Sequence, residues 1–272
     1  MLNFNLVGDS FTHKHSGHSG YSTYGKVPKY IDWKYDISLD TFYIEENMNL
    51  NLFNSNVNNY GWILEPKGIK PELFDHIKNN VEMYLKKFKY IFTNDSELLD
   101  YSNQFKFCPA SGTWIKDKQL HKKTKLISMI ASNKNTTEGH KTRLYWANKL
   151  KNHLDLYGRI SKETTIESKE VALNDYMFSV VVENGFFDTY FSEKILDCFV
   201  TGTIPIYWGT NSISKYFDER GIIFIDDSFN INDITRELYQ SKLEYVKTNF
   251  DVAVREEYET LEDYIYLNYL KK

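Results

Sequence analysis

Short apolar runs alternate with amphipathic stretches along most of the chain. An apolar run of strand length that stops abruptly at polar residues is typical of a buried β-strand. An apolar residue at every third or fourth position indicates a helix with one buried face. We predict strands at residues 2–7, 60–64, 90–93, 105–109, 126–131, 154–157, 177–182, 204–207 and 222–225, and helical stretches at 71–86, 140–153, 193–201 and 231–272. This alternation predicts an α/β protein with two doubly wound parallel sheets.

Residues 176–209 carry the most informative pattern, which is a buried strand, a polar loop, a short helix and a second strand. Ser192 can cap the helix, and Gly202 supplies the left-handed residue that ends it. Glu193 and Lys194 then lie in its first turn, where unpaired backbone N–H groups and the helix dipole favour an anion. Because Lys194 adds a full positive charge there, a nucleoside diphosphate would suit this position.

Three short motifs in this segment resemble a known family. They are Glu-Asn at 183–184, Tyr-Phe-Ser-Glu-Lys-Ile at 190–195 and Gly-Thr-Ile-Pro-Ile-Tyr-Trp-Gly at 202–209. Together they resemble the C-terminal donor signature of family 10 glycosyltransferases, the α1,3/4-fucosyltransferases. Ser192 replaces the usual threonine, and since serine caps a helix as well as threonine does, the exchange keeps the expected geometry.

The resemblance implies a GT-B fold, in which two Rossmann-like domains face a central cleft. The N-terminal half would bind the acceptor, and the C-terminal half would bind the nucleotide sugar. Ser132 and Asn133 with Arg143 resemble the family's Ser-Asn loop and phosphate-contacting arginine, and Glu65 occupies the place of its N-terminal catalytic glutamate. Glu65, Ser132-Asn133, Glu183-Asn184 and the Glu193-Lys194 turn lie at or just beyond the ends of predicted strands, as ligand-binding residues do in open α/β sheets.

The implied reaction moves L-fucose from GDP-fucose to a glycan hydroxyl, with α1,3-type linkage and inversion in one step. Arg143 and Lys194 would stabilise the leaving diphosphate without a metal ion or other cofactor, and Glu65 would take the proton of the acceptor hydroxyl. Glu193 would hold donor hydroxyls or orient Lys194. The predicted donor-binding residues are Ser132, Asn133, Arg143, Glu183, Asn184, Tyr190, Ser192, Glu193 and Lys194.

Each of these roles has a simpler alternative. Arg143 could be a solvated helix residue, and Glu65 before a proline could satisfy only loop amides. Glu193 and Lys194 could be ordinary charges of a helix start. For the whole chain, the alternatives are the same fold with another nucleotide-sugar donor, or a catalytically silent carbohydrate-binding homologue.

The length of 272 residues exceeds a typical single domain of roughly 100–200 residues. We predict an acceptor-side domain at 1–118, a donor domain at 119–250 and a C-terminal helical segment at 251–272, with the basic stretch 116–125 as linker. The net charge of −4 provides no general basic field for nucleic acid or an anionic membrane. The expected partners are therefore the nucleotide-sugar donor and an oligosaccharide or glycoconjugate acceptor.

The remaining patterns argue against metals, disulfides and membrane insertion. Cys108 and Cys198 form no disulfide or zinc pattern. A histidine-rich loop holds His13, His15 and His18 without nearby ligands of metal-site spacing, and Asp226-Asp227 is interpreted as a loop or cap pair. No apolar run reaches about 18 residues, and the N-terminus does not resemble a signal peptide, so a soluble cytoplasmic protein is expected.

Overall fold

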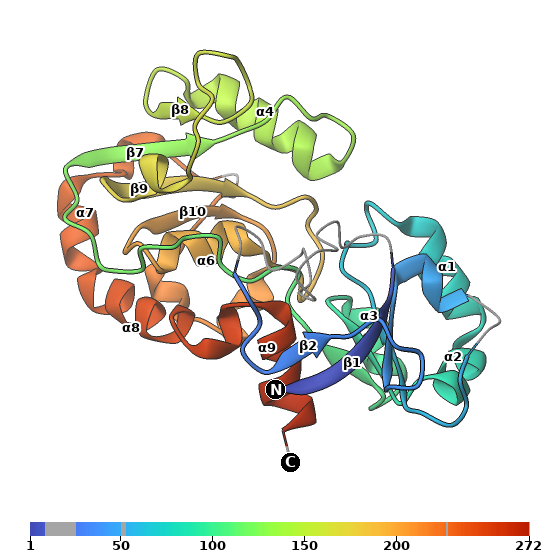
Figure 1. Cartoon of the computed structure of the whole chain (residues 1–272). Coiled ribbons are helices and arrows are strands. Elements are labelled where there is room, and N and C mark those ends of the chain that lie inside the picture. The colour runs from blue at the N-terminus through green and yellow to red at the C-terminus, as the bar shows by residue number, and fades with distance from the viewer. Residues whose placement is uncertain (9–25, 50–52, 227, 272) are drawn as a thin grey trace. The chain divides into compact units, whose positions relative to one another are not determined.

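The computed structural model describes residues 1–8, 26–49, 53–226 and 228–271, and it divides into two compact units (Figure 1). Unit 1 contains Met1–Gly112 and Glu256–Lys272, and unit 2 contains Thr113–Arg255. Each unit has its own parallel sheet, so the predicted α/β class with two parallel sheets is confirmed. The three histidines at 13, 15 and 18 and Asp227 lie outside the described residues.

Unit 1 is built on a six-stranded sheet with the order β2-β1-β3-β4-β5-β6. The strands are β1 (Leu2–Val7), β2 (Ile31–Trp33), β3 (Thr41–Ile44), β4 (Asn59–Trp62), β5 (Tyr90–Thr93) and β6 (Phe105–Phe107). Its helices are α1 (Pro71–Asn79), α2 (Val81–Lys87), α3 (Ser96–Tyr101) and α9 (Leu261–Ile265), with the π-helical turn Tyr266–Leu270. The single helix predicted over 71–86 is wrong, because the backbone at Asn80 leaves the helical conformation and separates α1 from α2.

The C-terminal segment 256–272 completes unit 1. The Asp263 carboxylate accepts hydrogen bonds from the backbone N–H groups of Lys29 (2.8 Å) and Tyr30 (3.2 Å). Glu262 is fully buried, and Trp33 Nε1 donates to its Oε1 over 3.4 Å. Within the described part of the chain, Glu262 Oε2 has no hydrogen-bond partner. Burial raises the pKa of Glu262 to about 8, so this buried side chain is mostly protonated at neutral pH.

Unit 2 is built on a five-stranded parallel sheet with the order β11-β10-β9-β7-β8. The strands are β7 (Lys125–Ile130), β8 (Asp155–Tyr157), β9 (Tyr176–Val182), β10 (Ile204–Trp208) and β11 (Ile223–Phe224). The helices are α4 (Glu138–Leu150), α5 (Glu170–Leu173), α6 (Glu193–Phe199), α7 (Arg236–Ser241) and α8 (Leu243–Ala253). The direction of winding reverses between β7 and β9, and ligands of open α/β sheets bind at such a switch point.

The register of β9 brings the predicted motifs to one edge of this sheet. All seven residues of β9 are buried, which explains the continuous apolar run in the sequence. Val182 pairs with Trp208 of β10, and Met129 of β7 pairs with Val180 of β9. The segments that follow these three strands therefore leave the sheet at the same carboxyl edge. Gly202 has the predicted left-handed backbone, with a φ of 73°.

The basic segment predicted as a linker belongs to unit 2 in the structure. Its Lys123 donates hydrogen bonds to the backbone oxygens of Leu173, Asn174 and Thr201 and to Thr203 Oγ1. Farther along, Asp226 Oδ1 accepts hydrogen bonds from Ser228 N and Oγ, which is the local loop role predicted for it. No helix among the described residues combines the length and the apolar character needed to cross a bilayer.

Candidate donor-binding site

The start of α6 is held by a buried glutamate at the end of β9. Ser192 is the N-cap, as predicted, and its Oγ accepts a hydrogen bond from Lys194 N over 3.5 Å. The Glu183 carboxylate, which is fully buried, accepts from Ser192 N (3.1 Å) and Ser192 Oγ (2.6 Å). Glu183 thus fixes the position of the helix start relative to the sheet edge.

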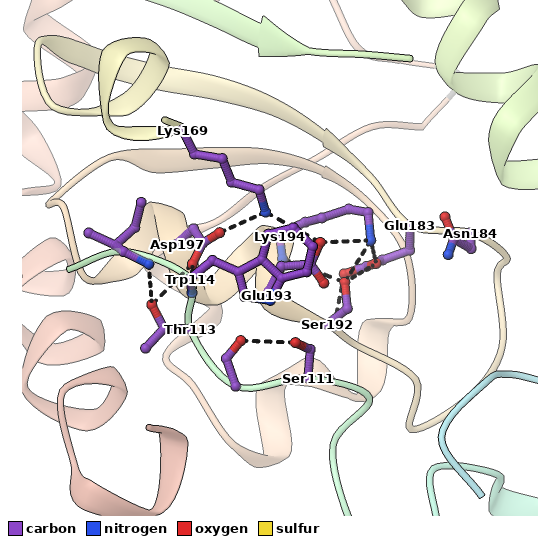
Figure 2. Close-up of polar contacts among 12 residues, drawn as sticks. Ser111, Thr113, Trp114, Lys169, Glu183, Asn184, Ser192, Glu193, Lys194 and Asp197 are labelled. Carbon is purple, nitrogen blue, oxygen red and sulfur yellow. Dashed lines mark hydrogen bonds and ion pairs between the residues drawn. The ribbon is translucent and has the colours of Figure 1, made fainter. Parts of the chain in front are cut away.

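Lys194 lies at the centre of this arrangement (Figure 2). Its Nζ is 2.9 Å from Ser192 Oγ, 3.3 Å from Glu183 Oε2 and 3.5 Å from Glu193 Oε1. The side chain is 22% exposed, so the ammonium group is held by protein partners on one side and is still accessible. Such a cation can form charge-assisted hydrogen bonds to an anion.

Arg143 reaches the same strand end from α4. Its Nε and Nη2 donate to Val182 O over 3.3 and 2.7 Å, and Nη2 also donates to Asn184 Oδ1 over 3.1 Å. None of these contacts uses Nη1. Burial lowers the pKa of Arg143, while Glu183, Glu193 and Tyr190 oppose this change. With 7% exposure, Arg143 is buried, which excludes the alternative of a solvated helix residue.

The position of Arg143 within its helix differs from the prediction. We expected the helix to begin at residue 140 and Arg143 to lie in its first turn. Thr137 instead caps the helix by accepting from His140 N, so that α4 begins at Glu138 and Arg143 lies in the second turn. The first turn is polar and contains a glycine, and apolar periodicity therefore did not reveal it.

Gly139 allows α4 to approach the end of β9. A Cβ atom at this position would lie 1.9 Å from Glu183 O, and Gly139 N donates to Asn184 O over 3.3 Å. Any side chain at 139 would therefore push the helix away from the residues that Arg143 contacts.

Replacing Gly139 with alanine is expected to destabilise the protein by about 2 kcal/mol and to weaken binding at this site. The measurement is the thermal midpoint together with nucleotide affinity. Lys141→Ala in the same helix, at an exposed position, is the matched control and should change neither quantity much. An unchanged midpoint and affinity in Gly139→Ala would show that the helix can shift without cost.

His140 is a site residue that sequence analysis missed. Its Nδ1 accepts a hydrogen bond from Thr137 N over 3.3 Å and completes a reciprocal cap at the start of α4. Burial lowers the pKa of His140, and the positive charges of Arg143, Lys134 and Lys194 lower it further. These three cations therefore converge around the start of α4. A threonine three residues before a histidine that can bond back to it was the available sequence signal.

The other predicted donor-site residues surround this edge of the sheet. Ser132 and Asn133 follow β7 in a loop, where Ser132 is half-buried and Asn133 is exposed. Tyr190 is 2% exposed in the loop between β9 and α6. The structure joins Glu183, Ser192, Glu193 and Lys194 by side-chain contacts, and Arg143 contacts Asn184, the residue that follows Glu183. Lys169, which no motif marks, also belongs to this set through its contact with Glu193.

Glu65 belongs to unit 1, where it follows β4. Its backbone N–H donates to Glu45 Oε1 over 2.9 Å. Glu45 comes directly after β3 with a φ of 49°, and its Oε2 lies 3.2 Å from Lys70 Nζ. Glu45 therefore fixes the backbone that carries Glu65, and a non-glycine residue at positive φ shows that the surrounding contacts impose this conformation.

Comparisons with known proteins find similarity to fucosyltransferases in the part of the chain that contains this site. Residues 120–251, just under half of the chain, match the family model described as "Glycosyltransferase family 10 (fucosyltransferase) C-term". A protein of Acanthamoeba polyphaga mimivirus whose name assigns it to the fucosyltransferases is 29% identical over 116 residues, which are 38% of this chain and 19% of that protein. The α-(1,3)-fucosyltransferase FucT of Helicobacter pylori is 34% identical over 68 residues, which are 25% of this chain and 14% of that enzyme.

The chain thus spans less than one fifth of the length of these two curated relatives. A crystal structure of an α1,3-fucosyltransferase resembles the whole chain in fold, with a TM-score of 0.55 and 16% identity, covering 100% of this chain and 90% of that one. Together with the two parallel sheets, this likeness confirms the predicted GT-B fold class. The motif matches, the family model and the relatives agree: residues 120–251, within unit 2, are similar to the C-terminal part of glycosyltransferase family 10, the fucosyltransferase family.

Proposed function

We propose that this protein is an inverting fucosyltransferase that moves L-fucose from GDP-fucose to a glycan hydroxyl, in α1,3-type linkage. The observation that carries the proposal is the placement of two cations around the end of β9. Arg143 contacts Val182 and Asn184, and Lys194 contacts Glu183 between them. A nucleoside diphosphate at this edge would meet both positive charges, as the leaving group of the reaction requires.

The remaining predicted residues either contact the donor or support those that do. In the proposal, Asn184 and Tyr190 contact ribose, phosphate or sugar, and Ser132 and Asn133 contribute from the loop after β7. Glu193 holds donor hydroxyls or orients Lys194, to which it is already paired. Glu183 and Ser192 support the site by fixing the helix start, because their mutual contacts occupy the carboxylate.

The chemical step needs charge stabilisation on one side of the sugar and a base on the other. As the bond from the anomeric carbon to the diphosphate breaks, the electron pair moves to the phosphate oxygens, where Arg143 and Lys194 stabilise it. The acceptor oxygen attacks the opposite face and loses its proton to Glu65, the proposed base from unit 1. One such displacement inverts the anomeric configuration.

Calorimetric titration with GDP, UDP and GDP-fucose in the presence of EDTA tests this proposal. We expect GDP and GDP-fucose to bind and UDP not to bind. Lys194→Ala should weaken GDP binding by about 100-fold, since a charge-assisted contact to phosphate is lost. Lys151→Ala, an exposed lysine at the other end of α4, is the matched control and should bind GDP as the wild type does.

The other outcomes separate the alternatives. Binding of UDP alone would contradict the fucosyl donor and favour another nucleotide sugar. Absence of binding to all three nucleotides would favour a catalytically silent carbohydrate-binding homologue.

A further inference from the structure

The polar contacts around α6 continue beyond the proposed donor site to a second lysine (Figure 2). Lys169 lies directly before α5, and its Nζ is 2.8 Å from Asp197 Oδ2 and 3.3 Å from Glu193 Oε1. The same ammonium group lies 4.0 Å from the ring centroid of Trp114. The side chain of Lys169 is 16% exposed, and those of Glu193 and Asp197 are 12% and 1% exposed. These contacts are therefore largely shielded from water.

Asp197 anchors Lys169 to the first residues of unit 2. One carboxylate oxygen contacts Lys169, and the other accepts hydrogen bonds from Thr113 Oγ1 (3.0 Å) and Trp114 N (2.7 Å). Asp197 lies one helical turn after Glu193, on the same face of α6. Lys169 therefore bridges two acidic residues of one helix, and its ammonium group also contacts the ring of Trp114.

Glu193 is shared between two lysines. Its Oε1 is 3.3 Å from Lys169 Nζ and 3.5 Å from Lys194 Nζ. Burial alone would raise the pKa of Glu193, but the charges of Lys194 and Lys169 outweigh it and bring the pKa to about 2. Glu193 is thus ionised at neutral pH and would attract Lys194 more strongly if Lys169 were uncharged.

The charges around α6 balance only when Lys169 is included. Ion pairs join Glu183, Glu193 and Asp197 to Lys169 and Lys194. Burial lowers the pKa of a third cation, Arg143, and the charges of Glu183 and Glu193 act to raise it. Without Lys169 these side chains would carry a net negative charge. Because the shielded surroundings weaken solvent screening, this negative charge would oppose the binding of the donor's anionic diphosphate nearby.

We propose that Lys169 is a positioning residue for the donor. By neutralising Glu193 and Asp197, it leaves Lys194 available to bind the diphosphate. This inference rests on the proposed function. A purely structural role for Lys169 would instead stabilise α6 without a specific effect on nucleotide affinity, so the test must separate affinity from folding.

The test is a double-mutant cycle between Lys169 and Glu193, read by GDP affinity in calorimetry and by the thermal midpoint. We expect Lys169→Met to weaken GDP binding about tenfold and Lys169→Arg to stay within about threefold of wild type. Combined with Glu193→Gln, the Lys169→Met substitution should have a smaller effect on GDP affinity than it has alone, because one of the two carboxylates that Lys169 neutralises is then gone. Lys169→Gln keeps a hydrogen-bond donor without the charge. It replaces Lys169→Met in the cycle if the methionine variant does not fold.

Three results would overturn the inference in different ways. If wild type binds GDP and the uncharged variants bind it equally well, Lys169 has no role in donor binding and the proposed function stands. If their weaker binding persists undiminished in the Glu193→Gln background, Lys169 acts through structure alone. If wild type does not bind GDP, both the proposed function and this inference are wrong.

Discussion

Replacing Glu65 with glutamine is expected to lower kcat by about 10³-fold and to leave the Kd for GDP unchanged. Glutamine keeps the size of the side chain and its hydrogen-bonding capacity, but it cannot accept the proton of the acceptor hydroxyl at neutral pH. Because the base acts only in the chemical step, donor binding in unit 2 should not depend on it. The measurements are steady-state transfer from GDP-fucose and a GDP titration of the same variant.

The surroundings of Glu65 hold the backbone that carries this side chain. Pro66 restricts Glu65 to an extended backbone. The backbone N–H of Glu65 is taken by Glu45, which is itself paired with Lys70. In this arrangement it is Glu45, and its carboxylate, that satisfies the loop amide at position 65.

Glu72→Gln provides the control for this experiment, because Glu72 is an exposed carboxylate in the first turn of α1. Its kcat should match that of wild type. Should Glu65→Gln retain wild-type kcat, the base must be sought elsewhere. A variant that also loses GDP binding would indicate a folding defect instead of a missing base.

Replacing Glu262 with glutamine is expected to stabilise the protein at alkaline pH by roughly 5 kcal/mol. Glu262 is fully buried, and burial is the main reason why its pKa is raised to about 8 from the ordinary value of 4.5. Between these two pH values the folded protein holds a proton that the unfolded chain has released. Wild-type stability therefore falls as the pH rises from about 4.5 to 8, at about 1.4 kcal/mol per unit, and then levels off.

Glutamine removes this proton linkage and can keep the hydrogen bond from Trp33 Nε1 through its amide oxygen. Urea unfolding at pH 5, 7 and 9 measures the difference, which should be small at pH 5 and largest at pH 9. Glu82→Gln, an exposed position on α2 in the same unit, should keep the wild-type pH dependence. Parallel pH profiles of wild type and Glu262→Gln would contradict the prediction.

Much of unit 2 could be predicted from the sequence because its elements carry local signals. The nearly unbroken apolar run of β9, the cap at Ser192 and the left-handed Gly202 each have a residue-level cause. The same holds for β1 and β5 of unit 1, whose bounds match the predicted strands. The short strands β2 and β3 were not predicted.

Long-range contacts explain what the sequence did not reveal. Lys169 joins the site through Glu193 and Asp197, which are 24 and 28 positions away. Trp33 and Glu262 are 229 positions apart, and the last predicted helical stretch gave no sign that its final part packs in unit 1. The predicted domain boundaries and the roles of the individual site residues stay proposals for the experiments above.

Unit 1 is made of two separate stretches of the sequence, and this affects the order in which the chain can fold during synthesis. The ribosome delivers all of residues 113–255 before α9, so that the sheet of unit 1 is translated long before the segment that supplies Glu262 and Asp263. Unit 2, which is contiguous, can fold first. The backbone at Gly112 lies against Glu259, where a Cβ would meet the carbonyl oxygen at 2.7 Å. A short engineered connection between residues 112 and 256 would therefore give unit 1 as one uninterrupted polypeptide.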